Sequence, residues 1–255
     1  MKAFALTDVG QMRDCNQDYV FCSEAPVGIL PNLFIVADGM GGHTAGDFAS
    51  RFCVEEFIHQ IKEKPDKTVV TTIEKAIRET NEQLIRQAKE HAELDGMGTT
   101  FVLASFFGDR LCIANIGDSR LYRISEKMEQ ITMDHSLVAE MVRNGDLNEE
   151  AARFHPNKNI VTRALSTSGV VIPDFFEVVL HSGDVVMLCS DGLFSMLENH
   201  VIFDIINEHR QNPEEACREL VRRANENGGK DNISVIIITD LPEGNISGGM
   251  EKMND

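Results

Sequence analysis

The segment LFIVADGMGGH, residues 33–43, decides the fold that we expect for this chain. Its first five residues form a short, continuous apolar run, which is typical of a buried strand. The run ends at Asp38, and four glycines follow between residues 39 and 46, too many for a hairpin turn. Helical spacing of apolar residues begins at about residue 47. We therefore expect Asp38 at the end of a strand that leads through a loop into a helix.

The same pattern, an apolar run that arrives at an acid next to glycine, occurs again along the chain. It is written at IANIGD (113–118) and LCSDG (188–192), and in reverse at GGKDN (228–232). Asp-Gly and Gly-Asp pairs also punctuate ordinary hairpins. We assign that turn role to Asp109 and Asp184, which strands flank closely. For Asp38 and Asp191 the pattern favours a functional role.

Several carboxylates at neighbouring strand ends can share one site only if some are protonated or a cation lies between them. For Asp118 and Asp231 a simple turn remains an equal alternative. Two unit charges about 4 Å apart repel by on the order of 4 kcal/mol at an effective dielectric constant of roughly 20, so clustered aspartates either take up protons or bind metal. Oxygen ligands without the Cys/His spacing of a zinc site indicate Mg²⁺ or Mn²⁺. The chain contains no EF-hand loop, phosphate-binding Gly-Lys-Ser/Thr loop, dinucleotide fingerprint or Gly-x-Ser-x-Gly elbow. Covalent catalysis is therefore unsupported.

The composition is that of an acidic protein with one domain. The chain has 255 residues, with 24 Lys and Arg against 41 Asp and Glu, and a formal net charge of −17. No basic run interrupts this acidity, which argues against binding to nucleic acid or to anionic membranes. The six cysteines form no C-x-x-C pair, and the apolar run 233–238 is far too short to span a membrane. We expect a monomeric cytoplasmic protein that binds neither nucleic acid nor membrane.

Hydrophobic periodicity predicts an α+β fold. Helices are expected at residues 47–64, 67–92, 199–209 and 213–226, with a short helix around 137–142. Strands are expected at residues 33–37, 101–107, 110–116, 121–124, 175–180, 185–190 and 233–239. Residues 145–172 lose clear periodicity and are interpreted as an irregular flap insert. We expect a central β-sandwich of two mainly antiparallel sheets flanked by helices, forming one domain over residues 1–241 with a flexible tail at 242–255.

Eight short motifs, in order and through most of the chain, carry a resemblance to a known family. They are TDVG (7–10) with Arg13 and NQD (16–18), then DGMGGH (38–43), GTT (98–100), GDSR (117–120), DHS (134–136), TRAL (162–165), SDGL (190–193) and GGKDN (228–232). Together they resemble the metal-dependent protein phosphatase family of type 2C, in its compact bacterial form. Any one motif is weak evidence, whereas the ordered series is highly specific.

The resemblance implies a binuclear Mg²⁺ or Mn²⁺ site at one end of the sandwich. Asp38 matches the acid that bridges both metals, and Gly39 matches the residue that lends its backbone carbonyl to the first metal. Asp191 and Asp231 match ligands of the second metal. Asp118, together with Asp191, matches the site of a weaker third ion.

Three further positions are implied to act around the metals. Asp18 matches an outer-shell acid that holds water on the first metal. Arg13 matches the phosphate-binding arginine, whose planar guanidinium fits a phosphoryl group bidentately. His43 matches the family's proposed general acid, which protonates the leaving serine or threonine oxygen; the alternative is that it only orders a metal-bound water. The implied reaction is in-line attack of metal-activated water on phosphorus.

The resemblance implies a protein serine/threonine phosphatase that acts on phosphorylated proteins, including a Ser/Thr kinase. Two alternatives share the same site: a non-catalytic phosphoprotein-binding module of this fold, and a hydrolase of small phosphoesters. Ser-Thr-Ser-Gly at 166–169 follows the TRAL motif where many relatives have glycine, so we expect the flap backbone to run differently. His135 is interpreted as a structural residue at a helix entrance, with Ser136 or Asp134 as the N-cap.

Overall fold

Strand β3 (Leu33–Met40) lies between two hydrophobic cores of the molecule. Its side chains alternate between two cores, as they must in a strand. Leu33, Ile35 and Ala37 belong to the core beneath two helices, whereas Phe34 and Val36 belong to the core between two sheets. All five are fully buried. A strand covered on both faces reads as a continuous hydrophobic run, which is what the sequence shows.

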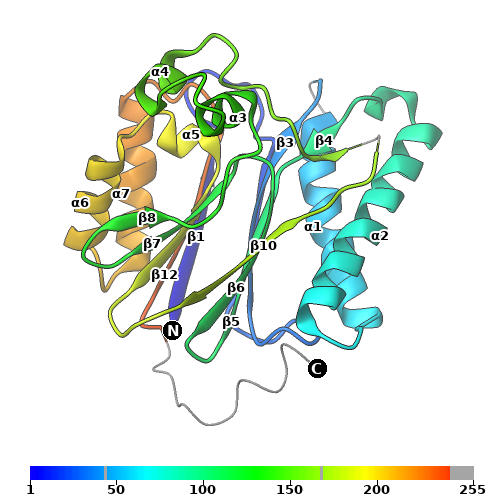
Figure 1. Cartoon of the computed structure of the whole chain (residues 1–255), viewed down its shortest axis with the longest axis horizontal. Coiled ribbons are helices and arrows are strands. Elements are labelled where there is room, and N and C mark those ends of the chain that lie inside the picture. The colour runs from blue at the N-terminus through cyan, green and yellow to red at the C-terminus, as the bar shows by residue number, and fades with distance from the viewer. Residues whose placement is uncertain (43–44, 167–168, 242–255) are drawn as a thin grey trace.

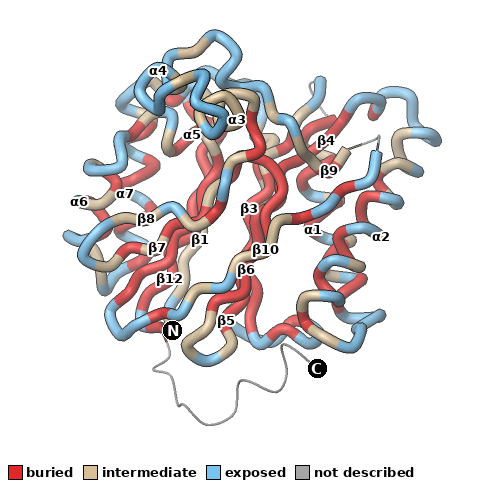
Figure 2. The backbone as a smooth tube through the Cα atoms, viewed as in Figure 1, coloured by how far each residue is buried: buried red, intermediate tan, exposed pale blue. Residues whose placement is uncertain are grey.

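The computed structural model describes residues 1–42, 45–166 and 169–241, and in these ranges two antiparallel sheets face each other (Figure 1). The first sheet has the order β1 (Lys2–Asp8), β12 (Ile233–Thr239), β11 (Val185–Cys189), β7 (Arg120–Ile124) and β8 (Met128–Gln130). The second has the order β10 (Asp174–Val179), β6 (Arg110–Ile116), β5 (Phe101–Phe107), β3, β4 (Gly98–Thr99) and β9 (Leu165–Ser166), with β2 (Asp18–Ser23) paired to β3. The central strands, among them β3, β5, β6 and β12, are mostly red in Figure 2, which marks the buried centre of the protein, whereas the edge strands β1 and β10 contain no buried residue.

Helices cover the outer face of each sheet. The second sheet carries α1 (Ala45–Glu63) and α2 (Val69–Glu90), which is followed by the short 3-10 helix η1 (Ala92–Leu94). The first sheet carries α5 (Asp191–Phe194), α6 (Asn199–Glu208) and α7 (Pro213–Glu226). Helix α7 begins as its sequence predicts, because the Asn212 side chain accepts a hydrogen bond from the Glu215 N–H at 3.3 Å and proline occupies the first turn. The result is a helix–sheet–sheet–helix sandwich.

The structure confirms the expected α+β class and most expected elements, with three corrections. Strands β1 and β2 were not predicted from the sequence. Strand β3 continues beyond Ala37 because Asp38 pairs with Asp18 in β2 and Gly39 pairs with Thr99 in β4. The third correction concerns the segment that was expected to be irregular: it contains α4 (Glu149–Phe154).

The flap segment lies at one end of the sandwich, beside α3 (Leu137–Arg143) (Figure 1). Helix α4 forms because the Asn148 side chain caps the Ala151 N–H at 2.7 Å and two glutamates occupy its first turn. The expected departure of the flap at residues 166–169 falls partly outside the described ranges, and the expected tail at 242–255 lies wholly outside them. Within those ranges no helix is both long enough and apolar enough to cross a membrane.

Candidate active site

The antiparallel strands bring five aspartates to one end of the sandwich. Asp18 at the start of β2 is the register partner of Asp38 near the end of β3. In the facing sheet, β11 ends just before Asp191 and its neighbour β12 begins just after Asp231. Strand β6 ends just before Asp118. Because antiparallel neighbours alternate starts and ends along one sheet edge, residues far apart in the sequence meet there.

Electrostatics confirm that these five carboxylates share one region. Burial, increased by the charges of the four other aspartates, raises the pKa of Asp38 well above its ordinary value. Burial likewise raises the pKa of Asp18 and of Asp118 to about 7, and Asp191 adds to both rises. The pKa of Asp191 rises to about 6 through burial and through Asp231. The raised pKa values of Asp18, Asp38, Asp118 and Asp191 therefore follow from burial first and from neighbouring carboxylates second, as expected for a cluster that lacks positive charge.

The donor set fits a hard divalent cation. In the described ranges no group of three or more His, Cys, Asp or Glu side chains converges closely enough to hold a metal ion by itself. However, Mg²⁺ usually keeps several waters and takes only one or two protein carboxylates, so a closed protein cage is not required. The Oδ1 atoms of Asp18 and Asp191 are buried and have no hydrogen-bond partner. Such unpartnered acceptors are costly unless a cation or an ordered water satisfies them.

The backbone around Asp38 is held by hydrogen bonds from the GTT motif. The Asp38 N–H donates to Thr100 Oγ1 at 2.9 Å, and the Asp38 carbonyl accepts from Thr99 Oγ1 at 3.0 Å and from the Thr100 N–H at 2.9 Å. Gly39 has no room for a side chain, because a Cβ there would lie 2.0 Å from the Gly46 carbonyl oxygen. The sequence therefore has glycine at this position because the first turn of α1 packs directly against β3.

Ser190 joins the two sheets at the cluster. Its Oγ donates to Asp18 Oδ2 at 2.7 Å and accepts from the Ser234 N–H at 2.9 Å. Asp18 is only 5% exposed, and it lies on the sheet opposite to Ser190. The position of Asp18 thus depends on the docking of the two sheets, and the short Ser190 contact fixes one of its oxygens.

The N-terminal loop carries Arg13 to the cluster. Arg13 Nη2 donates to Asp231 Oδ2 at 2.7 Å, while half of the arginine side chain remains exposed. Asn232 anchors this loop, because its Nδ2 donates to the carbonyls of Val9 and Cys15, each at 2.9 Å. A guanidinium has five N–H donors, so most remain available to a further anion. Arg13 is the cation that the site presents toward solvent.

His135 ties the flap to the loop that carries Asp118. Its Nδ1 accepts from the Gly117 N–H at 3.0 Å, and its Nε2 lies 2.9 Å from Asp174 Oδ2. Asp174 Oδ1 in turn accepts from Arg163 Nη1 at 2.6 Å. Burial, the largest influence on His135, lowers its pKa. The structural role predicted for His135 is confirmed, and Ser136 rather than Asp134 caps α3.

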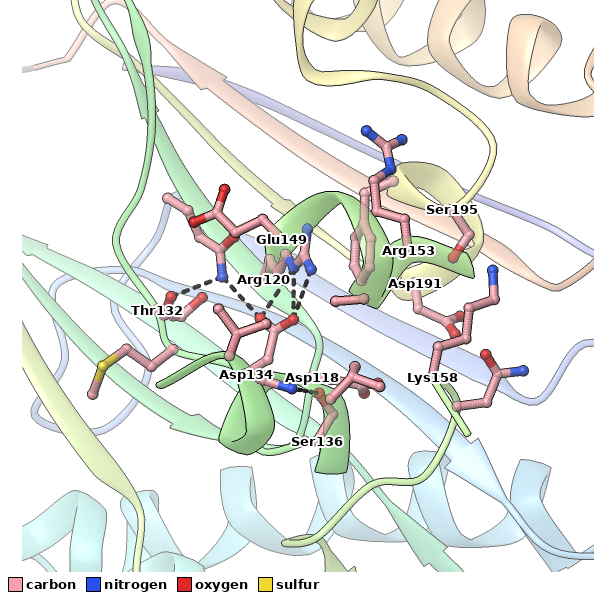
Figure 3. Close-up of a pocket in the computed structure, with 18 of the residues that line it drawn as sticks. Asp118, Arg120, Thr132, Asp134, Ser136, Glu149, Arg153, Lys158, Asp191 and Ser195 are labelled. Atoms are coloured by element: carbon pink, nitrogen blue, oxygen red, sulfur yellow. Dashed lines mark hydrogen bonds and ion pairs between the residues drawn. The ribbon is translucent and has the colours of Figure 1, made fainter. Parts of the chain in front are cut away.

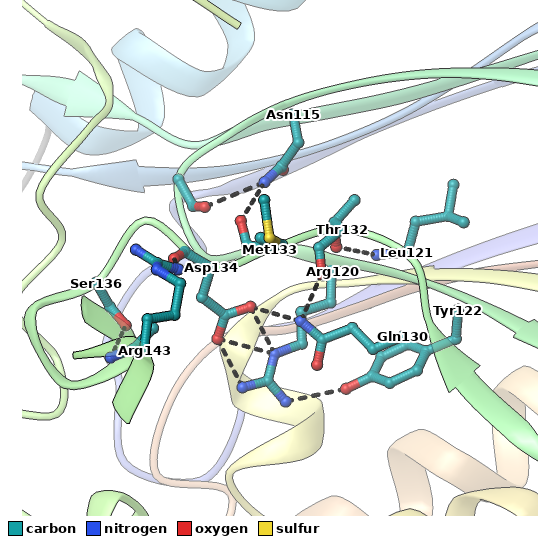
Figure 4. A network of polar contacts seen from close by, with 12 residues as sticks. Asn115, Arg120, Leu121, Tyr122, Gln130, Thr132, Met133, Asp134, Ser136 and Arg143 are labelled. Carbon is teal, nitrogen blue, oxygen red and sulfur yellow. Dashed lines mark hydrogen bonds and ion pairs between the residues drawn. The ribbon is translucent and has the colours of Figure 1, made fainter. Parts of the chain in front are cut away.

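A second polar network supports the Asp191 side of the cluster (Figure 4). Arg120 donates from Nε to Asp134 Oδ1 at 3.0 Å and from Nη2 to Asp134 Oδ2 at 2.7 Å. Its Nη1 donates to the Tyr122 hydroxyl at 2.9 Å, and its guanidinium lies 3.6 Å from the ring centroid of Phe194. Phe194 ends the short helix that Asp191 begins. The network therefore fixes α5, and with it Asp191, against β7.

The structure brings together the predicted residues Asp18, Asp38, Asp118, Asp191 and Asp231, with Gly39 and Arg13 beside them. His43 lies outside the described residues. The sequence analysis did not assign roles to Thr100, Ser190 and Asn232, which orient the site. Each of these three residues lies inside one of the recognised motifs. Their membership of these motifs could have predicted a role in the site.

Comparison with known proteins identifies the family. The family model described as "Protein phosphatase 2C" matches residues 4–233. A curated relative named "Serine/threonine phosphatase stp", from Listeria innocua, is 39% identical over 248 residues, covering 93% of this chain and 95% of the relative.

Two solved structures extend this result. The serine/threonine phosphatase of S. agalactiae superposes with a TM-score of 0.85 at 34% identity, covering 94% of this chain and 99% of that one. The catalytic domain of the serine threonine protein phosphatase PstP, solved in complex with two manganese ions, gives a TM-score of 0.78 at 32% identity, covering 92% and 96%. Family model, relatives and fold agree over nearly the whole length, and this chain belongs to the protein phosphatase 2C family.

Proposed function

We propose that this phosphatase hydrolyses phosphoserine and phosphothreonine in phosphorylated proteins at the aspartate cluster, and that residues 1–241 form one catalytic domain. The observation that carries the proposal is the meeting of five mutually repelling carboxylates with the solvent-facing guanidinium of Arg13. The carboxylates can hold divalent cations, and Arg13 can bind the phosphoryl group that those cations attract.

The aspartates divide the work of holding two cations, Mn²⁺ or Mg²⁺. In our assignment Asp38 would hold both ions, the Gly39 carbonyl would help to hold the first, and Asp191 with Asp231 would hold the second. Asp118 and Asp191 together offer a weaker third position. When bound, such ions polarise the phosphoryl group and make water nucleophilic near neutral pH. The buried, unpartnered oxygens of Asp18 and Asp191 support this assignment.

Three further residues bind the phosphoryl group, orient water and donate a proton. Arg13 binds the phosphoryl oxygens and stabilises the charge that grows on them. Asp18, held by Ser190, orients water on the first cation from the inner side of the site. His43 protonates the leaving serine or threonine oxygen, because its ordinary pKa lies close to the working pH.

The substrates that suit this site are proteins rather than small phosphoesters, and we include among them a Ser/Thr kinase phosphorylated on its own loops. The exposed loop position of Arg13 supports access by a protein chain. We further propose a monomer in the cytoplasm; within the described ranges none of the six cysteines forms a disulfide, which is consistent with a reducing compartment.

The proposal is tested with Mn²⁺, a small aryl phosphate and a phosphothreonine peptide. We expect turnover of both substrates, and loss of most activity in Asp38→Asn, which removes a charge shared by two cations. Asp109→Asn, in the β5–β6 hairpin, is the matched control and keeps wild-type activity. Bound metal without turnover of either substrate refutes the proposal, as does a wild-type rate in Asp38→Asn.

A further inference from the structure

A cleft of roughly 480 Å³ opens beside the aspartate cluster, between the end of the sandwich and helices α3 and α4 (Figure 3). Asp118 and Asp191 line one side of it. The flap lines the other side, with Arg153 at the end of α4 and Lys158 in the loop that follows. The cleft therefore continues directly from the place where the phosphoryl group is expected.

The charge of this cleft differs from that of the whole protein, which has a net charge of −17. Eight charged residues line it: Asp118, Arg120, Asp134, Arg143, Glu149, Arg153, Lys158 and Asp191. Arg120 and Asp134 neutralise each other in the buried pair, and Asp118 and Asp191 belong to the metal-binding cluster. The flap side then keeps three cations, at residues 143, 153 and 158, against one carboxylate, Glu149. It is locally basic.

Within the described ranges, two of these three cations form no contact that stabilises the fold. Among the described residues, the side chains of Arg153 and Lys158 make no hydrogen bond or ion pair, and both residues are exposed. Arg143 donates to the carbonyl of Asp134 at 3.1 Å and has no carboxylate partner. By contrast, Arg222 on α7 pairs with two glutamates.

Lys158 and Asp191 line the same cleft, so the lysine lies on the side of the flap that faces the cluster. A cation at the end of α4 is favoured by the helix carbonyls, but this does not account for Lys158 in the loop beyond. Apolar side chains of Met133, Val138 and Val142 complete the lining, which suits a peptide segment better than a free anion.

We infer that this cleft binds an anionic side chain located a few residues from the phosphorylated serine or threonine of the substrate, with Arg153 and Lys158 supplying the attraction. The shared chemistry is a carboxylate or a second phosphoryl group on the same peptide. The inference rests on the proposed function and defines its substrate class: acidic or multiply phosphorylated segments are preferred over neutral ones.

The test compares three phosphothreonine peptides that differ at one flanking position, which holds glutamine, glutamate or a second phosphothreonine. The position is scanned on both sides of the scissile residue. With Mn²⁺ present, we expect kcat/KM at the best position to rise about fivefold to tenfold over the glutamine peptide, the size of two partly exposed charge contacts. The preference should shrink when salt is raised from about 50 mM to about 500 mM.

The variant R153Q/K158Q should bring the ratio of kcat/KM for the charged and neutral peptides close to one. The control K62Q/K127Q removes the same charge from α1 and from the β7–β8 turn, and should keep the wild-type ratio. A ratio of one in the wild type, or a ratio unchanged in R153Q/K158Q, overturns the inference. Hydrolysis of an aryl phosphate distinguishes failure of the cleft inference from failure of the proposed function. Turnover of the aryl phosphate without any peptide preference refutes only the cleft inference. Absence of all turnover refutes the phosphatase proposal as well. The glutamate and phosphothreonine peptides show which anion the cleft prefers.

Discussion

Replacing Asp118 by asparagine should stabilise the metal-free protein, which is the opposite of what most buried substitutions do. Asp118 is 7% exposed, and the hydrogen bond that its carboxylate accepts from its own backbone is a smaller influence on its pKa than burial and the charge of Asp191. Burial, followed by the charge of Asp191, raises its pKa to about 7. Asparagine has nearly the same shape and carries no charge, so it removes the repulsion while keeping the volume.

The magnitude follows from the difference between the folded pKa of about 7 and the ordinary value of 3.8. At about 1.4 kcal/mol per unit, the ionised carboxylate lowers the stability of the folded state by about 4 kcal/mol at pH 8. The buried amide costs about 1–2 kcal/mol for its own desolvation. A net gain of about 2–3 kcal/mol remains, which corresponds to a rise in Tm of roughly 5–10 °C for a chain of this size.

The sign of the pH dependence is fixed by the direction of the shift. Below about pH 4 the carboxyl group is protonated in both the folded and the unfolded chain, so wild type carries no penalty. As the pH rises from about 4 to 7 the unfolded chain has lost this proton while the folded chain still holds it, and wild-type stability falls. The advantage of Asp118→Asn should therefore grow across this window and then level off.

The assay is urea unfolding in EDTA between about pH 4.5 and 8.5, with Asp109→Asn as the control that leaves stability unchanged. Addition of Mn²⁺ should raise the Tm of wild type more than that of Asp118→Asn, because the cation relieves the repulsion that the variant lacks. A variant less stable than wild type at pH 8, or a gain independent of pH, would refute the cluster reasoning.

Two further predictions address the cations at the site. Arg13→Ala should lower kcat/KM for a phosphopeptide by about 10- to 100-fold, because a charge-assisted contact to the phosphoryl group is lost. Arg13→Lys should recover only part of this loss, because lysine lacks the bidentate fork of arginine. Steady-state kinetics measure both variants, and a wild-type kcat/KM in Arg13→Ala contradicts the assignment. Arg120→Met should lower the free energy of unfolding by about 1–3 kcal/mol, because the partly buried Asp134 loses the charged hydrogen bonds from Arg120 and keeps only the one from Gln130. Urea unfolding measures this loss, and a change below about 1 kcal/mol would show that the pair is dispensable.

Much of the fold could be predicted because its central strands are covered on both faces. The apolar runs of β3, β5, β6, β11 and β12 are long enough to be recognised without knowledge of their partners. Strands β1 and β2 escaped prediction because they are only partly buried, so their patterns are weaker. The two-residue strands β4 and β9 exist only through pairing with each other and with β3.

The candidate site could be predicted as a set of residues but not as an arrangement. The pattern of an apolar run followed by aspartate and glycine predicted Asp38 and Asp191 as candidates, because a strand end and the turn after it are encoded by neighbouring residues. The pairing of Asp18 with Asp38 and the contact of Ser190 with Asp18 depend on strand register and sheet docking, which short-range patterns do not encode. The same holds for Asn232, whose amide reaches a loop more than two hundred residues away in the chain.

The place of β12 in the first sheet has a consequence for folding during translation. This late segment sits between β1 and β11, and β1 has no other strand neighbour in that sheet within the described ranges. A nascent polypeptide therefore keeps β1 without a strand partner in this sheet until β12 has been translated, more than two hundred residues later. Asp231 and Asn232, just ahead of β12, arrive equally late, so no shorter translation product is expected to dephosphorylate anything.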